Sequence, residues 1–244
     1  MRLAIFDIDG TLTETNEVDS VCFVRAMADA HAVGRVNTNW GEYAHTTDSY
    51  ITREVLREHF GRAPEEAERA EFISSFVSLL EESRSRDAAL FGEVAGASAA
   101  LARLRVEPGW AVAIATGCWR GSGLLKLSAA GLETGGVPAA FAEDGVSREE
   151  ILLAALARAR ESYGRESFDA VVSLGDGLWD VGAARNLGFA FVGVGGGERA
   201  AALREAGVSH VMEDFKDYGR LLRCLDEAKV PAAPVENPRP ARES

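Results

Sequence analysis

The sequence has no apolar stretch long enough to cross a membrane, and its amino terminus lacks the pattern of a secretory signal peptide. It has few cysteines. Cys22, Cys118 and Cys224 are widely spaced and odd in number, which is typical of reduced thiols rather than of a disulfide framework. These absences predict a cytoplasmic protein with no membrane partner.

Positive charge is also scarce in this chain. The formal net charge is −12, which argues against a nucleic-acid-binding or anionic-membrane-binding surface. Lysine is much rarer than arginine, and the first lysine in the chain is Lys126. The apolar content of 47% is ordinary for a globular protein, and 244 residues suffice for one full core plus a small satellite domain.

The most informative stretch spans residues 3–13. Leu3–Phe6 is a continuous apolar run, which predicts a buried parallel strand, and it ends at Asp7 and Asp9. Ligands of open α/β sheets collect beyond the carboxyl ends of the strands, and two carboxylates there are costly without a cation between them. Oxygen ligands of this kind suit Mg²⁺. Taken alone, the same residues also fit a strand followed by an ordinary Asp-Gly turn.

A regular alternation of strands and helices begins at about residue 90. Helices are predicted over 93–106, over 121–130 and after Ser147, which forms a capping-box pattern with Glu150. Alternating strands and helices predict an α/β fold with a Rossmann-like parallel sheet and helices on both of its faces. The further predicted strands span residues 110–115, 137–141, 170–174, 189–194 and 209–212.

Residues 14–88 interrupt this alternation. Amphipathic stretches near residues 17–32, 47–60 and 64–86 predict helices, and no strand pattern lies among them. We therefore expect a helical cap over residues 15–88, inserted after the first strand of a core formed by 1–14 and 89–228. Within the cap, Trp40–Arg53 is the part expected to face a substrate. Residues 229–244 hold four of the seven prolines and predict a disordered tail.

Polar residues follow the other predicted strands at the same edge of the sheet. They are Thr116 and Gly117 after the second strand, Asp176 and Asp180 after the fourth, and Arg148 at the start of the helix after the third. Each alone has an ordinary structural explanation, such as a strand-end hydroxyl, a helix cap or an exposed helix start. Their succession at consecutive strand ends predicts one shared site.

This set of residues permits phosphoryl transfer. Asp7 directly follows its strand and suits a nucleophile that forms an aspartyl-phosphate, while Asp9 can protonate the leaving oxygen and then activate water. Mg²⁺ would be held by Asp7, Asp9, Asp176 and Asp180 and would let an anionic nucleophile approach an anionic phosphate.

Binding of the phosphoryl group is assigned to a second set of residues. The Thr116 hydroxyl and the Gly117 amide can hold a phosphoryl oxygen, Arg148 can offset its charge, and Gly10 completes the predicted substrate-binding set. Lys126 is the alternative cation, although it lies well inside the helix that follows Thr116.

The stretch from Asp7 to Thr13, the pair Thr116 and Gly117, a basic residue at 148, and the motif from Gly175 to Asp180 resemble the four motifs of the haloacid dehalogenase superfamily. The resemblance covers the core and implies the roles given above. An insertion after the first motif resembles the helical cap of phosphoglycolate phosphatases and β-phosphoglucomutases.

The resemblance also excludes some branches of that superfamily. Its true dehalogenases lack the acid that Asp9 supplies, and its phosphonate-cleaving branch needs a cap lysine, which this chain lacks because Lys126 is its first. The third motif is usually lysine, and here it is arginine.

The sequence thus predicts a Mg²⁺-dependent phosphatase that hydrolyses small phosphorylated metabolites. The alternatives are a sugar phosphomutase of the same fold and a catalytically weak, phosphate-binding scaffold. The sequence does not define the oligomeric state.

Overall fold

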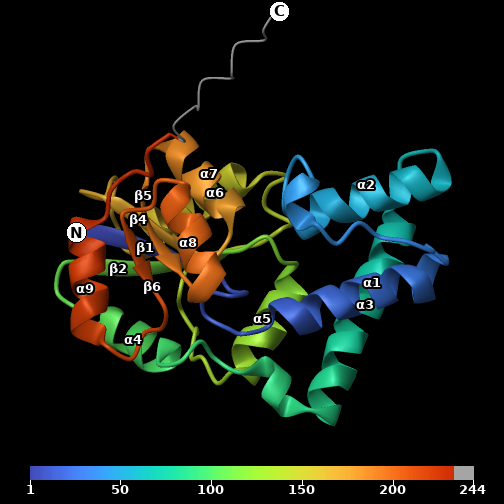
Figure 1. Cartoon of the computed structure of the whole chain (residues 1–244), viewed down its shortest axis with the longest axis horizontal. Coiled ribbons are helices and arrows are strands. Elements are labelled where there is room, and N and C mark those ends of the chain that lie inside the picture. Colours follow the sequence, from blue (N-terminus) through green and yellow to red (C-terminus); the bar gives the residue numbers. More distant parts are fainter. Residues whose placement is uncertain (234–244) are drawn as a thin grey trace, which may run out of the picture.

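The computed structural model describes residues 1–233, and residues 234–244 lie outside the description. The core is a six-stranded sheet in the order β3-β2-β1-β4-β5-β6, and every neighbouring pair is parallel (Figure 1). The strands are β1 (Arg2–Phe6), β2 (Trp110–Ala115), β3 (Ala139–Ala140), β4 (Val171–Gly175), β5 (Ala190–Val194) and β6 (His210–Met212). The predicted α/β fold with a Rossmann-like parallel sheet is therefore confirmed.

The strand order places β1 and β4 side by side, with Leu3 opposite Ala111 on one side and Val171 on the other. From β1 the chain builds β2 and β3 outward in one direction, then crosses over to build β4, β5 and β6 in the other. The crevice beyond the carboxyl ends of β1 and β4 is the switch point where ligands bind in sheets of this order.

The two faces of the sheet bury alternate residues of β1. Ala4 and Phe6 pack into a cluster with α4 and α9, whereas Leu3 and Ile5 pack into a cluster with α6. This alternation follows from the period of two along a strand. The helices of the core are α4 (Ala97–Leu104), α5 (Arg120–Ala129), α6 (Arg148–Ser162), α7 (Leu178–Leu187), α8 (Gly197–Glu205) and α9 (Tyr218–Glu227).

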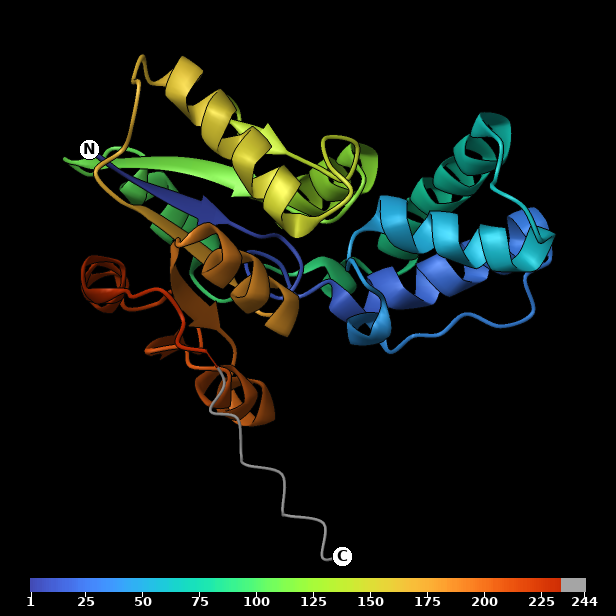
Figure 2. The same ribbon diagram turned by 90° about the horizontal axis from the view of Figure 1, so that it is seen from above.

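Three helices form a region beside the sheet, called here the helical region, with its own hydrophobic cluster (Figure 2). They are α1 (Asn16–His31), α2 (Asp48–Phe60) and α3 (Glu66–Arg86), joined by the short 3-10 helix η1 (Trp40–Glu42) and followed by η2 (Ala88–Phe91). Phe23 lies at the centre of the cluster, with its ring 4.9 Å from that of Phe72 and 5.8 Å from that of Phe76. The division of the chain into core and cap at residues 14 and 88 stays a prediction.

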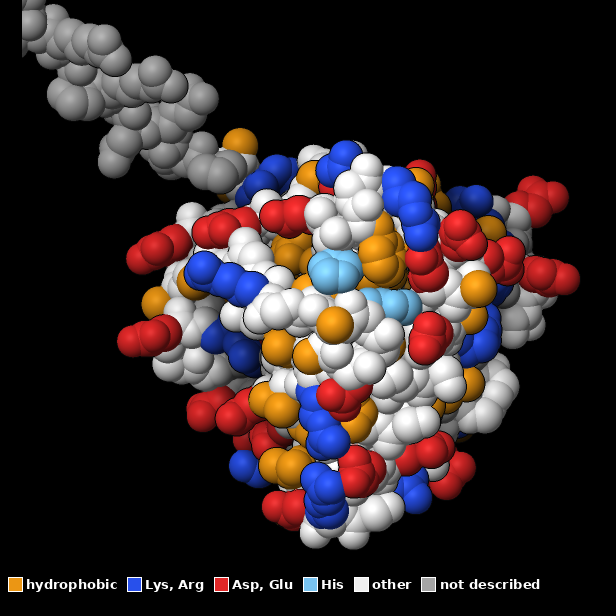
Figure 3. Space-filling view, turned by 90° about the vertical axis from the view of Figure 1, so that its right-hand side faces the viewer, with side chains coloured by type: hydrophobic (Ala, Val, Ile, Leu, Met, Phe, Trp, Pro, Cys, Tyr) orange, Lys and Arg blue, Asp and Glu red, His pale blue; other side chains and the backbone are white. Residues whose placement is uncertain are grey.

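The outer face of the helical region carries acidic and basic side chains side by side (Figure 3). No helix within residues 1–233 combines the length and apolarity of a membrane span.

The start of one predicted helix and the start of the predicted disordered tail differ from the structure. The predicted helix over 93–106 begins only at Ala97, because Gly96 adopts φ +83° and Glu93 bridges to Thr13 and accepts a hydrogen bond from the Ser98 amide at 2.6 Å. At the other end of the chain, Lys229 accepts a hydrogen bond from the Phe191 amide at 3.0 Å. The start of the predicted disordered tail is thus bound to β5, and the rest of that prediction, 234–244, lies outside the described residues.

The capping box predicted at the start of α6 is present, since the Glu150 amide donates to the Ser147 hydroxyl at 3.2 Å and the Glu150 carboxylate accepts from the Ser147 amide at 3.2 Å. Ser147→Ala is expected to lower the free energy of unfolding by about 1 kcal/mol, because the first turn loses an acceptor. Urea unfolding measures this. Ser128→Ala, an exposed change inside α5, is the control and should shift stability by less than about 0.5 kcal/mol; equal effects would contradict the capping role.

Candidate active site

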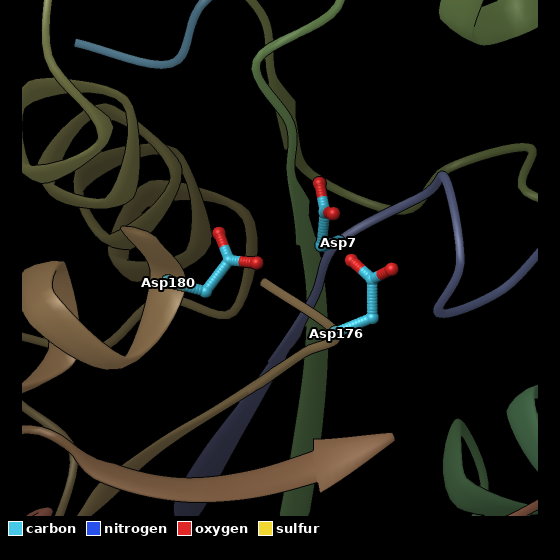
Figure 4. A group of neighbouring side chains, drawn as sticks. All are labelled: Asp7, Asp176 and Asp180. Carbon is cyan, nitrogen blue, oxygen red and sulfur yellow. The ribbon is translucent and has the colours of Figure 1, made fainter. Parts of the chain in front are cut away.

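Three buried carboxylates meet at the switch point. Asp7 directly follows β1, Asp176 directly follows β4, and Asp180 lies in the first turn of α7. Each offers an oxygen that lies within 4.8 Å of the others, and the three side chains converge in Figure 4. The parallel pairing of β1 with β4 brings Asp7 and Asp176 together, although they are far apart in the sequence.

Glycine at position 10 permits this approach. Gly10 adopts φ +71°, and a Cβ on it would lie 1.9 Å from Asp176 Oδ2 and 2.5 Å from Asn16 Nδ2. The side-chain amide of Asn16 donates to the same Asp176 oxygen through Nδ2 at 2.9 Å. Gly10 therefore leaves the space that the Asp176 carboxylate and its partner occupy.

Two arginines flank the carboxylates. Arg148 at the start of α6 places Nη1 3.0 Å from Asp7 Oδ1 and 3.5 Å from Asp180 Oδ1, while its Nε donates to the Thr46 carbonyl at 2.9 Å. On the other side, Arg199 Nη1 lies 3.1 Å from Asp176 Oδ2. The geometry thus brings Arg148, the predicted third-motif residue, to Asp7.

Burial and mutual repulsion make ionisation of two of the carboxyls costly. Burial and the neighbouring Asp7 raise the pKa of Asp176 to about 6, against the opposing effect of Arg199. Burial also raises the pKa of Asp180 to about 8, although Arg148 acts in the opposite direction. A divalent cation between these groups would remove the cost.

Asp9 lies outside this group of three carboxylates. Its carboxylate faces Lys126, with Nζ 2.6 Å from Oδ2, and also accepts from the Cys118 thiol at 2.7 Å and from the Thr15 hydroxyl. Burial opposes ionisation of Asp9, but Lys126, Cys118 and Thr15 outweigh it and lower the pKa. Lys126 is therefore the partner of Asp9, not of Asp7, and Asp9 is not one of the three carboxylates grouped at the switch point.

The loop after β2 carries the predicted phosphoryl-binding residues. Thr116 is buried, and its hydroxyl accepts from the Cys118 amide at 3.3 Å. A Cβ on Gly117 would lie 2.8 Å from the Thr46 carbonyl oxygen and 2.9 Å from Arg148 Cζ. The loop thus lies directly against Arg148 and against the segment that precedes α2.

A cavity of about 400 Å³ lies next to this loop and to the carboxylate cluster, although Asp7, Asp180 and Thr116 do not line it. Its core side includes Asp9, Gly117, Arg148 and Asp176. The helical region supplies the opposite wall, which includes part of the predicted segment Trp40–Arg53. The residues contributed by that region are Asn16, Asp19, Ser20, Phe23, Trp40, Thr46, Thr47, Asp48 and Ile51.

Several lining residues were not predicted as site residues. These include Asp19 on α1, Asp48 on α2 and Arg199 on α8. A single charged residue on an amphipathic helix belongs to no motif, so the sequence does not distinguish it from a residue that faces solvent. The one available signal was the glycine run at 195–197 before Arg199, which marks a tight turn at a strand end.

The sheet order and the carboxylate cluster define a Rossmann-like fold with a buried acidic site at its switch point. The family model for haloacid dehalogenase-like hydrolases matches residues 1–188. The chain belongs to this family, and the predicted membership is confirmed. No curated protein matches the chain in sequence.

Solved structures share the fold over nearly the whole chain. A hydrolase from Pseudomonas syringae has a TM-score of 0.68 and 22% identity, covering 93% of this chain and 99% of that one. A β-phosphoglucomutase from Clostridium difficile has a TM-score of 0.65 and 18% identity, covering 92% and 97%. A protein described as a predicted phosphoglycolate phosphatase, from Haemophilus somnus 129pt, has a TM-score of 0.57 and 16% identity. The match covers 90% of this chain and 97% of that one.

Proposed function

We propose that this hydrolase is a Mg²⁺-dependent phosphatase of small phosphorylated metabolites and that Asp7 forms an aspartyl-phosphate. The observation that carries the proposal is the convergence of Asp7, Asp176 and Asp180 within 4.8 Å beside the guanidinium of Arg148. Three carboxylates this close together would cost stability without a bound cation. A phosphoryl-transfer site needs both the clustered carboxylates, which hold a metal, and a fixed positive charge such as that of Arg148.

The donor set fits magnesium. Asp7, Asp176 and Asp180 offer carboxylate oxygens, the ligand type that hard divalent cations prefer. When bound, Mg²⁺ would supply positive charge that offsets the charge of the phosphoryl oxygens. Asp9 is proposed as a catalytic residue, while its carboxylate is left out of the metal-binding set because of its pairing with Lys126.

Asp7 is the proposed nucleophile because it directly follows a buried strand and its carboxylate lies beside Asp176, which lines the cavity. Its carboxylate oxygen would form a bond to phosphorus as the ester oxygen leaves. Arg148 would orient Asp7 and offset charge on the transferring group, while the Thr116 hydroxyl and the Gly117 amide would bind a phosphoryl oxygen.

Asp9 would protonate the leaving oxygen and later accept a proton from water. The ion pair with Lys126 at 2.6 Å keeps this carboxylate ionised. The acid step therefore requires the Asp9 side chain to leave Lys126 and to take up a proton before the ester oxygen leaves.

A phosphomutase would use the same core, and one solved structure with this fold is described as a β-phosphoglucomutase. A non-catalytic scaffold is the less favoured alternative, because the contact between Arg148 and Asp7 at 3.0 Å supplies the cation that phosphoryl transfer needs.

The test is hydrolysis of a panel of phosphate esters with Mg²⁺ and with excess chelator. We expect steady release of inorganic phosphate that falls at least about 100-fold on chelation, since the metal offsets charge in the transition state. Mg²⁺ should also raise the melting temperature of the wild type but not of Asp180→Asn. Conversion of a sugar phosphate to its isomer without phosphate release would identify a mutase. Metal-independent turnover would contradict the proposal.

A further inference from the structure

The lining of the cavity holds two groups of charged residues, called here the phosphoryl end and the acidic end. At the phosphoryl end, Arg148 and Arg199 are both paired with carboxylates of the cluster. At the other end, Asp19 from α1 and Asp48 from α2 line the wall, and neither arginine pairs with them within residues 1–233. A metal at the first end would add positive charge there, so the electrostatic contrast along the cavity would increase.

Lys126 is the cation that pairs with Asp19 at the acidic end. Lys126 places Nζ 2.6 Å from both Asp9 and Asp19, and its side chain is 0% exposed, so it has no free approach to a ligand. Asp48 accepts from the Trp119 amide at 3.0 Å through Oδ2, and in the described part of the chain no hydrogen bond or ion pair reaches its Oδ1. Asp48 therefore lines the cavity as an acid with no cation at ion-pair distance among residues 1–233, although Lys126 is near enough to oppose the rise of its pKa.

The surroundings of Asp48 suit a small organic cation. The rings of Phe23, Trp40 and Trp179 line the same cavity, and the face of an aromatic ring attracts an ammonium group. Burial and the neighbouring Asp19 raise the pKa of Asp48 to about 8. A positive charge beside this carboxyl would favour its ionised form.

Asp48 is also close to the phosphoryl end. Its amide donates to the Gly117 carbonyl at 2.8 Å, and Gly117 follows the proposed phosphoryl-binding Thr116. A ligand that spans the two ends therefore needs only a short spacer between its phosphate and its second polar group.

We infer that the substrate is a phosphate monoester whose leaving group carries an ammonium group a few atoms from the ester oxygen. This inference rests on the proposed phosphatase function and adds the class of leaving group. A carboxylate or second phosphate in that position would face Asp19 and Asp48, and a neutral polyol would form no charge-assisted hydrogen bond with Asp48.

The experiment compares kcat/KM for aminopropyl, hydroxypropyl and carboxyethyl phosphate, which differ mainly in the charge of the terminal group. We expect the aminopropyl ester to exceed the hydroxypropyl ester about tenfold, with the carboxyethyl ester lowest, because a charge-assisted hydrogen bond in a partly dehydrated site has that effect. Equal rates, or a preference for the hydroxypropyl or carboxyethyl ester, would overturn the inference.

Two variants locate the preference. In Asp48→Asn the ratio of aminopropyl to hydroxypropyl ester should fall to within about twofold. Asp29→Asn removes the same charge from an exposed position on α1, where Asp29 pairs with Arg25, and should keep the wild-type ratio. A ratio that survives in Asp48→Asn would assign the preference elsewhere and refute the role of Asp48.

Failure of the phosphatase function and failure of the ammonium preference give different results in these experiments. If the wild type hydrolyses neither these esters nor an aryl phosphate, the phosphatase function is wrong. Thermal shift with aminopropyl and hydroxypropyl phosphate then still tests the ammonium site, which requires stronger stabilisation by the amine. If esters are hydrolysed without a preference for the amine, only the inference about the leaving group is wrong.

Discussion

Asp7→Asn is expected to lower kcat for any accepted phosphate ester about 10⁴-fold or more while the chain remains folded. An amide oxygen is a poor nucleophile toward phosphorus, so the covalent step is lost. The fold should persist because the substitution conserves shape and relieves repulsion with Asp176 and Asp180, although the contact with Arg148 is weakened. Activity assays together with urea unfolding measure both parts of the expectation.

A chemical trap makes this test specific for covalent catalysis. Wild-type protein quenched during turnover of a labelled ester should carry acid-stable, hydroxylamine-sensitive label on the peptide that contains Asp7. Asp29→Asn serves as the surface control and should retain both label and rate. Label on another carboxylate, or substantial turnover by Asp7→Asn, would refute the assignment of the nucleophile.

Lys126→Met is expected to lower the free energy of unfolding by about 3 kcal/mol or more, the largest stability effect we foresee. The Lys126 side chain is 0% exposed, and its ammonium contacts Asp9 and Asp19 at 2.6 Å each. Removing this cation leaves two carboxylates in a poorly hydrated site without the positive charge that both contact. Chemical denaturation at neutral pH gives the loss directly.

The pH dependence separates this cause from a simple packing defect. Burial raises the pKa of Asp19 to about 6 even while Lys126 opposes the shift, so loss of Lys126 raises it further. A raised carboxyl pKa destabilises the fold above that pKa, and protonation relieves the cost as the pH falls. The deficit of Lys126→Met should therefore shrink between pH 8 and pH 5, whereas a packing defect would not change. Lys216→Met, in an exposed pair with Asp214, should cost less than about 0.5 kcal/mol.

The sheet could be predicted from the sequence because its strands are continuous apolar runs that end in glycine or polar residues. Leu3–Phe6 and Trp110–Ala115 are such runs, and the structure places strands there, β1 beginning one residue earlier. The short strand β3 was predicted three residues too long, because backbone pairing with β2 covers only Ala139 and Ala140. A run of apolar residues does not indicate how many of its residues pair with the neighbouring strand.

The residues of the proposed site also fall into those that the sequence could predict and those that it could not. Asp7, Asp176 and Asp180 follow strand ends, so the topology alone brings them together. The partners of Lys126 could not be predicted, because they depend on how α1 and α5 pack. Asp19 was missed for the same reason, and Asp48 was predicted only as part of the segment Trp40–Arg53, since the sequence of a helix does not state which of its polar residues turns toward a cavity.

The hydrogen bond from Arg148 Nε to the Thr46 carbonyl joins a core side chain to the segment just before α2. The planar guanidinium of Arg148 has enough donors to bind this carbonyl and Asp7 at once, which the point charge of a lysine could not do in a fixed plane. The orientation of the charge beside Asp7 is thus shared between two parts of the fold. Substitutions in the loop around Thr46 that move its carbonyl would consequently shift Arg148, and so would alter the rate of the chemical step as well as the choice of substrate.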